Sequence, residues 1–211
     1  MIIISSYKLK TFVFIVNTIG TVDDLIEKNI KIIDKLEQLS RLIYLKHKNH
    51  RDGNLLLGDC CDIKTGKLDA NACSKDGPYP FFTCGQEILK IDNYAFDCEA
   101  IIISGNGEIS AKYFKGKFNA YQRTYVLSPS KLFYLFMEEC KLSIFDLKNN
   151  SQGSVIKFIT KGMLENIAVV NDADSIHINS RLCELYKQIT NIKKELDILR
   201  NIKTKLLNKY F

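Results

Sequence analysis

The sequence predicts an α+β protein in which one mixed, strand-rich domain is flanked by two long helices that pair as an antiparallel coiled coil. Near both ends of the chain, apolar residues recur at alternating spacings of three and four. The middle instead concentrates Gly, Asn, Asp, aromatic residues and short β-branched runs. With 46% hydrophobic residues, the chain can bury a substantial core. The expected segments are a strand-like 1–20, a first helix 21–50, the strand-rich domain 51–172 and a second helix 173–211.

The first helix is expected to begin at Thr21, whose side chain can cap it. Asp23 and Asp24 then fall in the first turn, where carboxylates are favourable. Heptad spacing predicts a coiled-coil seam on one face. That seam consists of Leu25, Asn29, Ile32, Leu36, Leu39 and Ile43. Its polar member, Asn29, either fixes the register of pairing or faces solvent at a helix end.

The second helix repeats this pattern, with polar residues on its other faces. Its predicted seam consists of Leu182, Leu185, Ile189, Ile192, Leu196 and Leu199. Because one globular domain connects the end of the first helix to the start of the second, we expect the two to pair antiparallel. At 1.5 Å per residue, each helix is expected to be about 40 Å long.

The N-terminal stretch 1–16 is apolar, but Lys8 and Lys10 interrupt it, which favours a buried strand over a signal peptide. No stretch approaches the ~20 apolar residues of a membrane span. Seven cysteines without a CxxC pair favour reduced thiols over a disulfide framework or a zinc site. We therefore expect a cytoplasmic protein that contacts no membrane and binds no metal.

The middle domain contains recognisable strand and turn signals. Strands are predicted at Ala100–Ile103, Thr124–Leu127 and Val155–Ile159. Turns are predicted at Thr65-Gly66, Gly77-Pro78, Gly105-Asn106-Gly107 and Gly116. A short helix is predicted at Leu132–Glu139.

Positive charge is concentrated within this domain. The net charge is only +6, but the stretch from Ile109 to Met137 has five basic residues and no acidic one. Lys and Arg contacts to phosphate provide sequence-independent affinity for DNA, while amides, Arg and hydroxyls read base edges. The candidate DNA-binding residues are Lys64, Lys67, Tyr79, Thr83, Gln86, Lys112, Tyr113, Lys115, Lys117, Tyr121, Gln122 and Arg123. The alternative is that these strand residues simply face solvent and the tyrosines pack in the core.

Catalytic groups are not evident in the sequence. The three histidines, His47, His50 and His177, fall at helix margins, where they are poor bases for a nucleophile in the domain. Asp97 and Glu99 precede an apolar run and are better explained as a turn that leads into a buried strand. We predict a non-catalytic protein that binds no cofactor itself.

From about Thr18 onward, the chain resembles the specificity subunit of type I restriction-modification enzymes. The order and spacing of several short motifs, together with the flanking heptads, carry this resemblance. The motifs are Gly58-Asp59, Thr65-Gly66-Lys67, Pro80-Phe81-Phe82, Tyr94-Ala95-Phe96-Asp97, Ala100–Ile103, Gly105-Asn106-Gly107, Gly116–Ala120 and Gln152–Lys157.

The resemblance implies a target-recognition domain that binds double-stranded DNA. Members typically carry two such domains, separated by two conserved helices that pair as an antiparallel coiled coil, and each domain reads one half of a split target. They dock methyltransferase subunits and, through the complex, an endonuclease subunit. These partner subunits would use S-adenosylmethionine, ATP and Mg²⁺.

The order helix, domain, helix corresponds to the second half of such a member. The chain is therefore either a half-subunit that joins a second copy or a second half-subunit, or a truncated remnant in which 1–16 is left from a lost first domain. A non-enzymatic protein-binding module on a coiled-coil stalk is the alternative from another class.

Overall fold

The computed structural model describes the backbone of residues 2–149 and 158–210. The chain divides into two compact units. A helical unit comprises Met1–Leu42 and Arg181–Phe211, and a sheet unit comprises Ile43–Ser180. Among the described residues, no helix is both long enough and apolar enough to cross a membrane.

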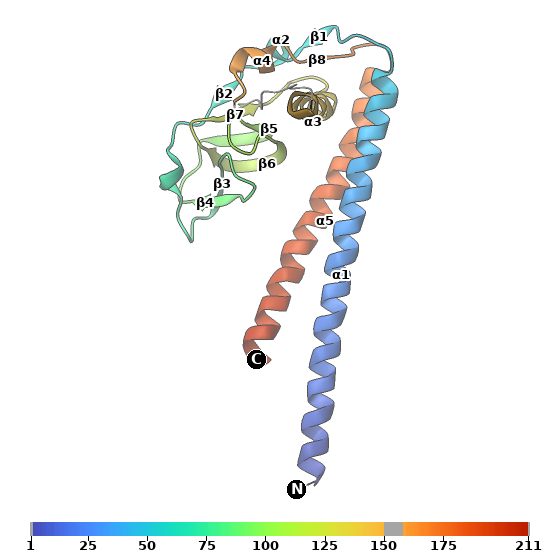
Figure 1. Ribbon diagram of the computed structural model, residues 1–211, viewed down its shortest axis with the longest axis vertical. Coiled ribbons are helices and arrows are strands. Elements are labelled where there is room, and N and C mark those ends of the chain that lie inside the picture. Colours follow the sequence, from blue (N-terminus) through green and yellow to red (C-terminus); the bar gives the residue numbers. More distant parts are fainter. Residues whose placement is uncertain (1, 150–157, 211) are drawn as a thin grey trace. The chain divides into compact units, whose positions relative to one another are not determined.

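The helical unit is built from α1 (Ile2–Lys48) and α5 (Ser175–Tyr210), which run side by side (Figure 1). Their ion pairs give the direction of pairing. Asp23 lies 2.6 Å from Lys203, and Glu37 lies 3.4 Å from Lys193. Partner numbers fall along α5 as they rise along α1, so the two helices are antiparallel. The predicted fold class is confirmed.

The packed stripe of α1 differs from the predicted seam. Leu25 and Leu39 expose 40% and 44% of their surface. The residues that follow them, Ile26 and Ser40, are half-buried and buried instead. The apolar cluster between the helices consists of Ile26, Ile33, Leu36, Ile189, Ile192 and Leu196. Asn29 and Leu36 of the predicted seam do lie in the packed stripe. Because α1 carries apolar residues on a face wider than one seam, the heptad pattern also selected exposed neighbours of packed residues.

Residues 2–20 form the first turns of α1, so the predicted strand and the predicted cap at Thr21 are both wrong. The Thr21 hydroxyl donates to the carbonyl of Asn17 at 2.9 Å, a bond made within a helix interior. In a helix the backbone N–H and C=O groups form hydrogen bonds within the segment, whereas a strand needs a neighbouring strand for them. The sheet provides no such neighbour for residues 2–20. With 47 residues, α1 is about 70 Å long, well beyond the expected 40 Å.

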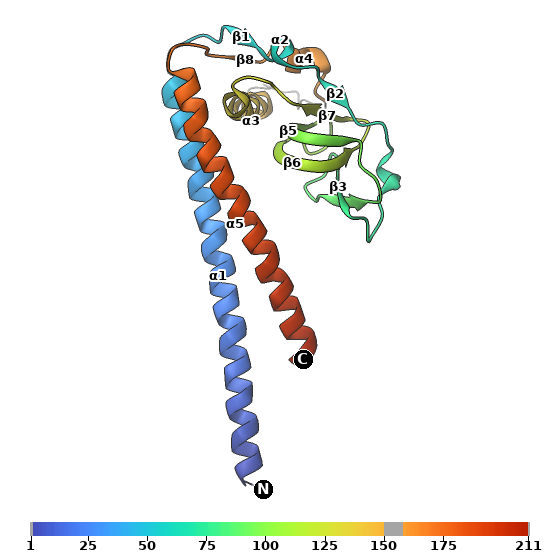
Figure 2. The same ribbon diagram turned by 180° about the vertical axis from the view of Figure 1, so that it is seen from behind.

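A six-stranded sheet forms the centre of the sheet unit, in the order β2-β7-β5-β6-β3-β4. Figure 1 labels all six strands, and Figure 2 shows the sheet from behind. All neighbouring strands are antiparallel except β3 and β6, which are parallel. The strands are β2 (Lys64–Thr65), β3 (Tyr79–Phe82), β4 (Leu89–Ile91), β5 (Phe96–Ser104), β6 (Ala111–Ala120) and β7 (Thr124–Leu127). A second, two-stranded sheet pairs β1 (Leu55–Leu56) with β8 (Ala168–Val169), near α2 (Leu57–Cys60) and α4 (Lys161–Glu165).

The two faces of the main sheet are covered differently. One face carries the apolar core, which consists of Phe82, Ala100, Ile102, Phe118, Ala120 and Val126. On the other, α3 (Phe133–Asn149) packs through Phe133 and Tyr134 against Tyr113 of β6. β5 lies between these layers, and its second half is fully buried.

Most predicted elements of the domain are present. Ala100–Ile103 lies within β5, Thr124–Leu127 is β7, and the predicted helix is the start of α3. Of the predicted strand Val155–Ile159, residues 155–157 lie outside the described residues. Gly116 is not a turn. It sits within β6 with φ of 131°, a backbone conformation that favours glycine.

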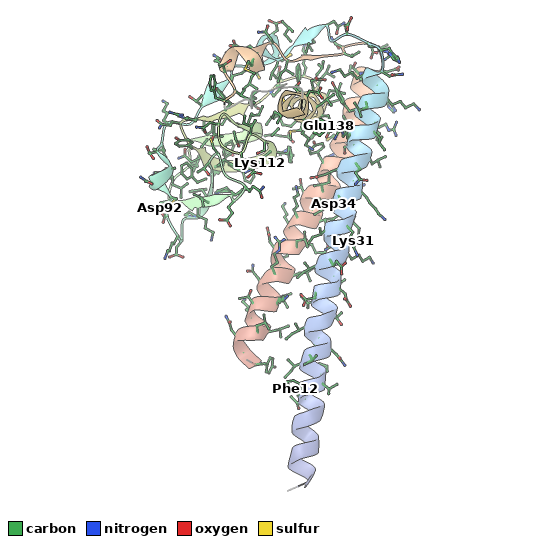
Figure 3. The ribbon with its side chains drawn as sticks, in the orientation of Figure 1. Phe12, Lys31, Asp34, Asp92, Lys112 and Glu138 are labelled. Carbon is green, nitrogen blue, oxygen red and sulfur yellow. The ribbon has the colours of Figure 1, made fainter. Side chains whose placement is uncertain are left out.

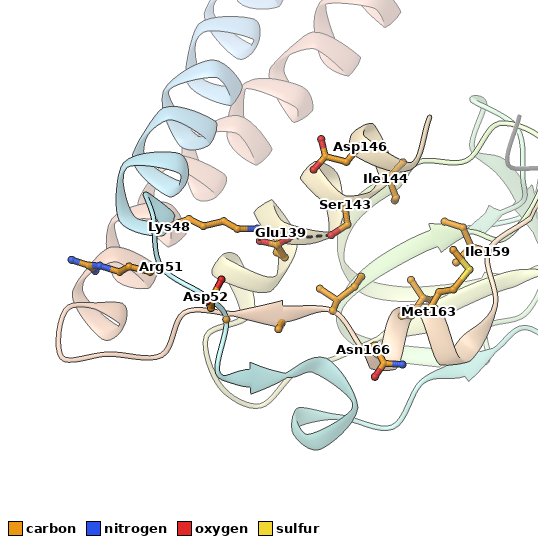
Figure 4. Close-up of a pocket in the computed structure, with 14 residues that line it drawn as sticks. Lys48, Arg51, Asp52, Glu139, Ser143, Ile144, Asp146, Ile159, Met163 and Asn166 are labelled. Atoms are coloured by element: carbon orange, nitrogen blue, oxygen red, sulfur yellow. Dashed lines mark hydrogen bonds and ion pairs between the residues drawn. The ribbon is translucent and has the colours of Figure 1, made fainter. Parts of the chain in front are cut away.

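The last turns of α1 belong to the sheet unit and are tied to α3 through the buried Glu139. The Tyr44 hydroxyl donates to this carboxylate, and Lys48 Nζ approaches it at 2.8 Å. Burial and the adjacent Glu139 charge raise the pKa of Tyr44, so Tyr44 remains a donor. Ser143 also donates to Glu139, at the wall of a pocket of about 810 Å³ (Figure 4).

Leu196→Ala should lower the free energy of unfolding by about 2–4 kcal/mol, because it opens a cavity in the packed stripe. Leu39→Ala, the same change at an exposed position, should cost well under about 1 kcal/mol. Urea unfolding followed by far-UV circular dichroism measures both. Equal losses would mean that Leu39 is packed.

Asn29→Leu should stabilise the helical unit. Asn29 is 7% exposed, and its Nδ2 is the one buried side-chain N or O among the described residues without a hydrogen-bond partner. Removing this amide should raise the free energy of unfolding by about 1–2 kcal/mol. Asn201→Leu, at an exposed site on α5, is the matched control and should change stability little. A destabilised Asn29→Leu would show that the amide has a partner in solution.

Candidate nucleic-acid interface

Four segments come together at one end of the main sheet: 66–68, 83–88, 105–108 and 121–123, here called the loop cluster. Backbone hydrogen bonds connect all four. Tyr121 N donates to Phe82 O at 2.9 Å and Gln122 N to Leu68 O at 2.9 Å. In the same way, Gly105 N donates to Arg123 O at 2.8 Å and Glu108 N to Cys84 O at 3.2 Å. The loops are therefore held against one another by bonds that do not depend on their side chains.

Two glycines allow this close approach. A Cβ at Gly66 would lie 1.9 Å from the carbonyl oxygen of Ala120, and one at Gly105 would lie 2.6 Å from that of Arg123. Neither contact can be relieved by rotating a side chain, because the obstacle is backbone. Both glycines lie in motifs that carried the resemblance, and their role is to bring neighbouring loops together.

Six of the candidate DNA-binding residues lie in the loop cluster. Their side chains differ in exposure. Lys67, Gln86, Gln122 and Arg123 are exposed, while Thr83 and Tyr121 are half-buried. Cationic and amide groups are thus displayed together on the surface of one set of loops. That combination suits contact with phosphates and base edges.

Lys112 lies on β6 beside this cluster (Figure 3), but its ammonium group is already engaged. Its Nζ donates to Gly85 O at 2.7 Å and to Gln86 O at 3.0 Å. Burial lowers the pKa of Lys112, against the opposing effect of Glu108. In this structure Lys112 braces the loop that follows β3, and its role as a phosphate contact stays a prediction.

Tyr113 and Lys115 are also engaged within the domain, at Glu99 of β5. The hydroxyls of Tyr113 and Tyr134 donate to Glu99 Oε1 at 2.6 Å each, and Lys115 Nζ lies 3.6 Å from Oε2. Burial alone raises the pKa of Glu99, but these hydrogen bonds and the Lys115 charge outweigh it, so the pKa lies below its ordinary value. The carboxylate joins β6 and α3 to the central strand.

The remaining candidates are Lys64, Tyr79 and Lys117, and only Lys64 is on an edge strand. Lys64 is exposed on β2, the strand at one edge. Near β4, at the other edge, the rings of Tyr79 and Tyr94 meet at 5.0 Å, and Lys117 Nζ lies 4.6 Å from the centre of the Tyr94 ring. Six of the twelve candidates thus lie in the loop cluster, Lys112 lies beside it, and the other five lie elsewhere on the sheet.

Two residues that hold candidate side chains in place were not among those selected from the sequence, Glu99 and Glu108. Glu99 was taken for part of a turn, but Asp97 and Glu99 both lie inside β5. The signal available was cross-strand alternation, since Glu99 pairs in register with Lys115. Glu108 follows a predicted turn and accepts a hydrogen bond from Gln86 Nε2 in the facing loop. No local sequence pattern predicts that Gln86, 22 positions earlier, is its partner.

Relatives of known type share this domain. The family model described as "Type I restriction modification DNA specificity domain" matches residues 54–171, which include the whole loop cluster. The type I restriction enzyme EcoDI specificity subunit of Escherichia coli is 39% identical over 153 residues, which are 69% of this chain and 34% of that protein.

Solved structures share the fold. The S subunit of a type I restriction-modification system from M. genitalium superposes with a TM-score of 0.70 at 19% identity, over 93% of this chain and 59% of that one. A chain from a structure of the type I R-M system, described in terms of complex assembly and conformational transition, gives a TM-score of 0.50 at 15% identity, over 95% and 57%. This chain spans about a third of the curated relative and less than two thirds of either solved chain.

A mixed sheet that displays polar loops, joined to two long antiparallel helices, is the fold that this chain shares with the M. genitalium S subunit. The chain belongs to the type I restriction-modification DNA specificity domain family, as the sequence motifs had indicated.

Tyr134→Phe should lower the free energy of unfolding by about 1 kcal/mol at neutral pH, because a hydrogen bond to a partly exposed carboxylate is lost. The folded-state pKa of Glu99 is depressed, so the stabilisation is present above the unfolded value near 4.5 and is lost as the pH falls through the folded value. The deficit of the variant should therefore shrink at about pH 3.

Urea titrations at the two pH values measure this difference. Tyr210→Phe, at an exposed ring, is the control and should match wild type at both. A Tyr134→Phe deficit that is unchanged by pH would assign the loss to packing and not to ionised Glu99.

Proposed function

We propose that this chain is a DNA-recognition component of a type I restriction-modification specificity subunit and that it binds one half of a bipartite duplex target. The observation that carries the proposal is the loop cluster: within the region matched by the family model, exposed Lys67, Gln86, Gln122 and Arg123 project from loops braced against one another.

The chemistry divides between these groups. Lys67 is a flexible point charge suited to a phosphate, with no sequence preference. Arg123 presents a planar fork that fits the O6 and N7 acceptors of guanine, and the Gln122 amide fits adenine. Loops fixed by backbone bonds hold such groups in place before DNA arrives, which reduces the entropy lost on binding.

Catalysis belongs to partner subunits in this proposal. The chain docks methyltransferase subunits that use S-adenosylmethionine, and an endonuclease subunit that uses ATP and Mg²⁺ joins through the complex. The chain itself binds no cofactor and works in the cytoplasm. The chain spans about a third of its curated relative, and the other half of the target is read by another recognition domain.

Arg123→Ala and Lys67→Ala should have different effects on DNA binding. Loss of Arg123 should cost roughly 1–3 kcal/mol at one base position and relax the preference there. Loss of Lys67 should weaken all sequences alike and reduce the slope of log K against log salt by about one.

Equilibrium binding to duplexes at several salt concentrations measures both effects. A wild-type chain that shows no salt-sensitive DNA binding, with no association with methyltransferase subunits, would contradict the proposal. Protein binding that is indifferent to both substitutions would instead support the stalked protein-binding module.

A further inference from the structure

Lys112 fixes two consecutive carbonyls of the loop between β3 and β4. It lies on β6, close to the turn that contains Glu108, and pairs in register with Ile102 of β5. Its bonds to Gly85 O (2.7 Å) and Gln86 O (3.0 Å) hold the loop where Gln86 projects. A second bond, from Glu108 N to Cys84 O, ties the same loop to the facing turn. The backbone on both sides of Gln86 and Glu108 is thereby held in place.

The side chains of Gln86 and Glu108 meet across these two loops, because Gln86 Nε2 donates to Glu108 Oε1. A carboxylate only accepts hydrogen bonds, so the Gln86 amide must turn its nitrogen toward it. This leaves two acceptors, Gln86 Oε1 and Glu108 Oε2, for which the described part of the chain supplies no donor. Both side chains are exposed.

We propose that Gln86 and Glu108 form a base-reading pair, positioned by Lys112, that selects adenine or cytosine on one strand of the target. Paired acceptors match the exocyclic amino groups that these two bases present in the major groove, at N6 and N4. Guanine and thymine present O6 and O4 at the same place, and two oxygens facing each other repel. This inference rests on the proposed DNA-recognition function and adds a specificity-determining pair to it.

Electrostatics explain why the pair needs Lys112. A carboxylate beside a phosphate backbone is repelled unless a cation is close, and the Glu108 charge acts on the Lys112 ammonium. The ammonium, half-buried and bonded to two carbonyls, compensates that charge without reaching for a phosphate. Lys112 is therefore a positioning residue, unlike the exposed Lys67.

The test is selection of the full chain on a library of random duplex DNA, sequenced after binding at two salt concentrations. At one position of the wild-type motif, exchanging the two bases of the pair (A·T for T·A, or C·G for G·C) should lower enrichment, because the amino group then lies on the other strand. Glu108→Gln should reduce discrimination at that position by roughly tenfold and leave the other positions unchanged. Lys112→Met should do the same, with the salt slope of total binding unaltered.

Lys112→Arg is the conservative variant and should restore discrimination, because a guanidinium can also donate to both carbonyls. In hydrogen exchange, Lys112→Met should raise the exchange of the amides at 83–87, while β7 exchanges as in wild type. This readout separates release of one loop from unfolding of the domain.

The outcomes distinguish two failures. A wild-type chain that enriches no sequence and binds without salt dependence overturns the proposed function, and this inference with it. A wild-type chain that enriches a motif overturns the inference alone if both Glu108→Gln and Lys112→Met leave every position unchanged. The same conclusion follows if the position that they affect accepts its base pair equally well in both orientations, A·T as T·A or C·G as G·C.

Discussion

The register of β5 is the constraint on which the rest of the recognition domain depends. This strand pairs with β6 on one side and β7 on the other, and its residues alternate between the aromatic core and the face that holds Glu99. A slip of one residue would place Glu99 in the aromatic core and turn Ile102 away from it, at the cost of a buried charge. The same register sets where the turn at 105–108 leaves the strand, and hence where the loop cluster forms.

The fold class followed from local signals, since heptad spacing and β-branched runs act over a few residues. What could not be predicted depended on partners distant in sequence. The apolar composition of residues 2–20 is compatible with a strand or a helix. They form a helix because the sheet provides no neighbouring strand with which they could pair. Similarly, Leu39 and Ser40 lie on adjacent faces of α1, and the position of α5 determines which one is buried.

In the candidate site, too, local sequence signals were predictive and contacts between distant residues were not. Residue type identified the region, because basic and amide side chains are frequent in the sequence from Lys64 to Arg123. The loops then bring Lys67 and Arg123 into one cluster. Residue type did not identify which groups are already occupied. Lys112 and Lys115 are both lysines of β6, but their partners differ. Lys112 braces a loop through carbonyl oxygens, whereas Lys115 lies beside the Glu99 carboxylate on the opposite face of the sheet. Those partners are about fifteen or more positions away along the chain.

The buried Glu139 determines where this domain can be cut from one chain and joined to another. Its partners Tyr44 and Lys48 precede the 54–171 region that defines the family, yet they fold with the sheet. A recombination junction placed at residue 54 would supply new residues opposite this carboxylate, and an unpaired buried charge costs about 3–5 kcal/mol. Exchange of recognition domains between such chains therefore preserves folding when the crossovers fall inside the helices, before Ile43 and after Ser180.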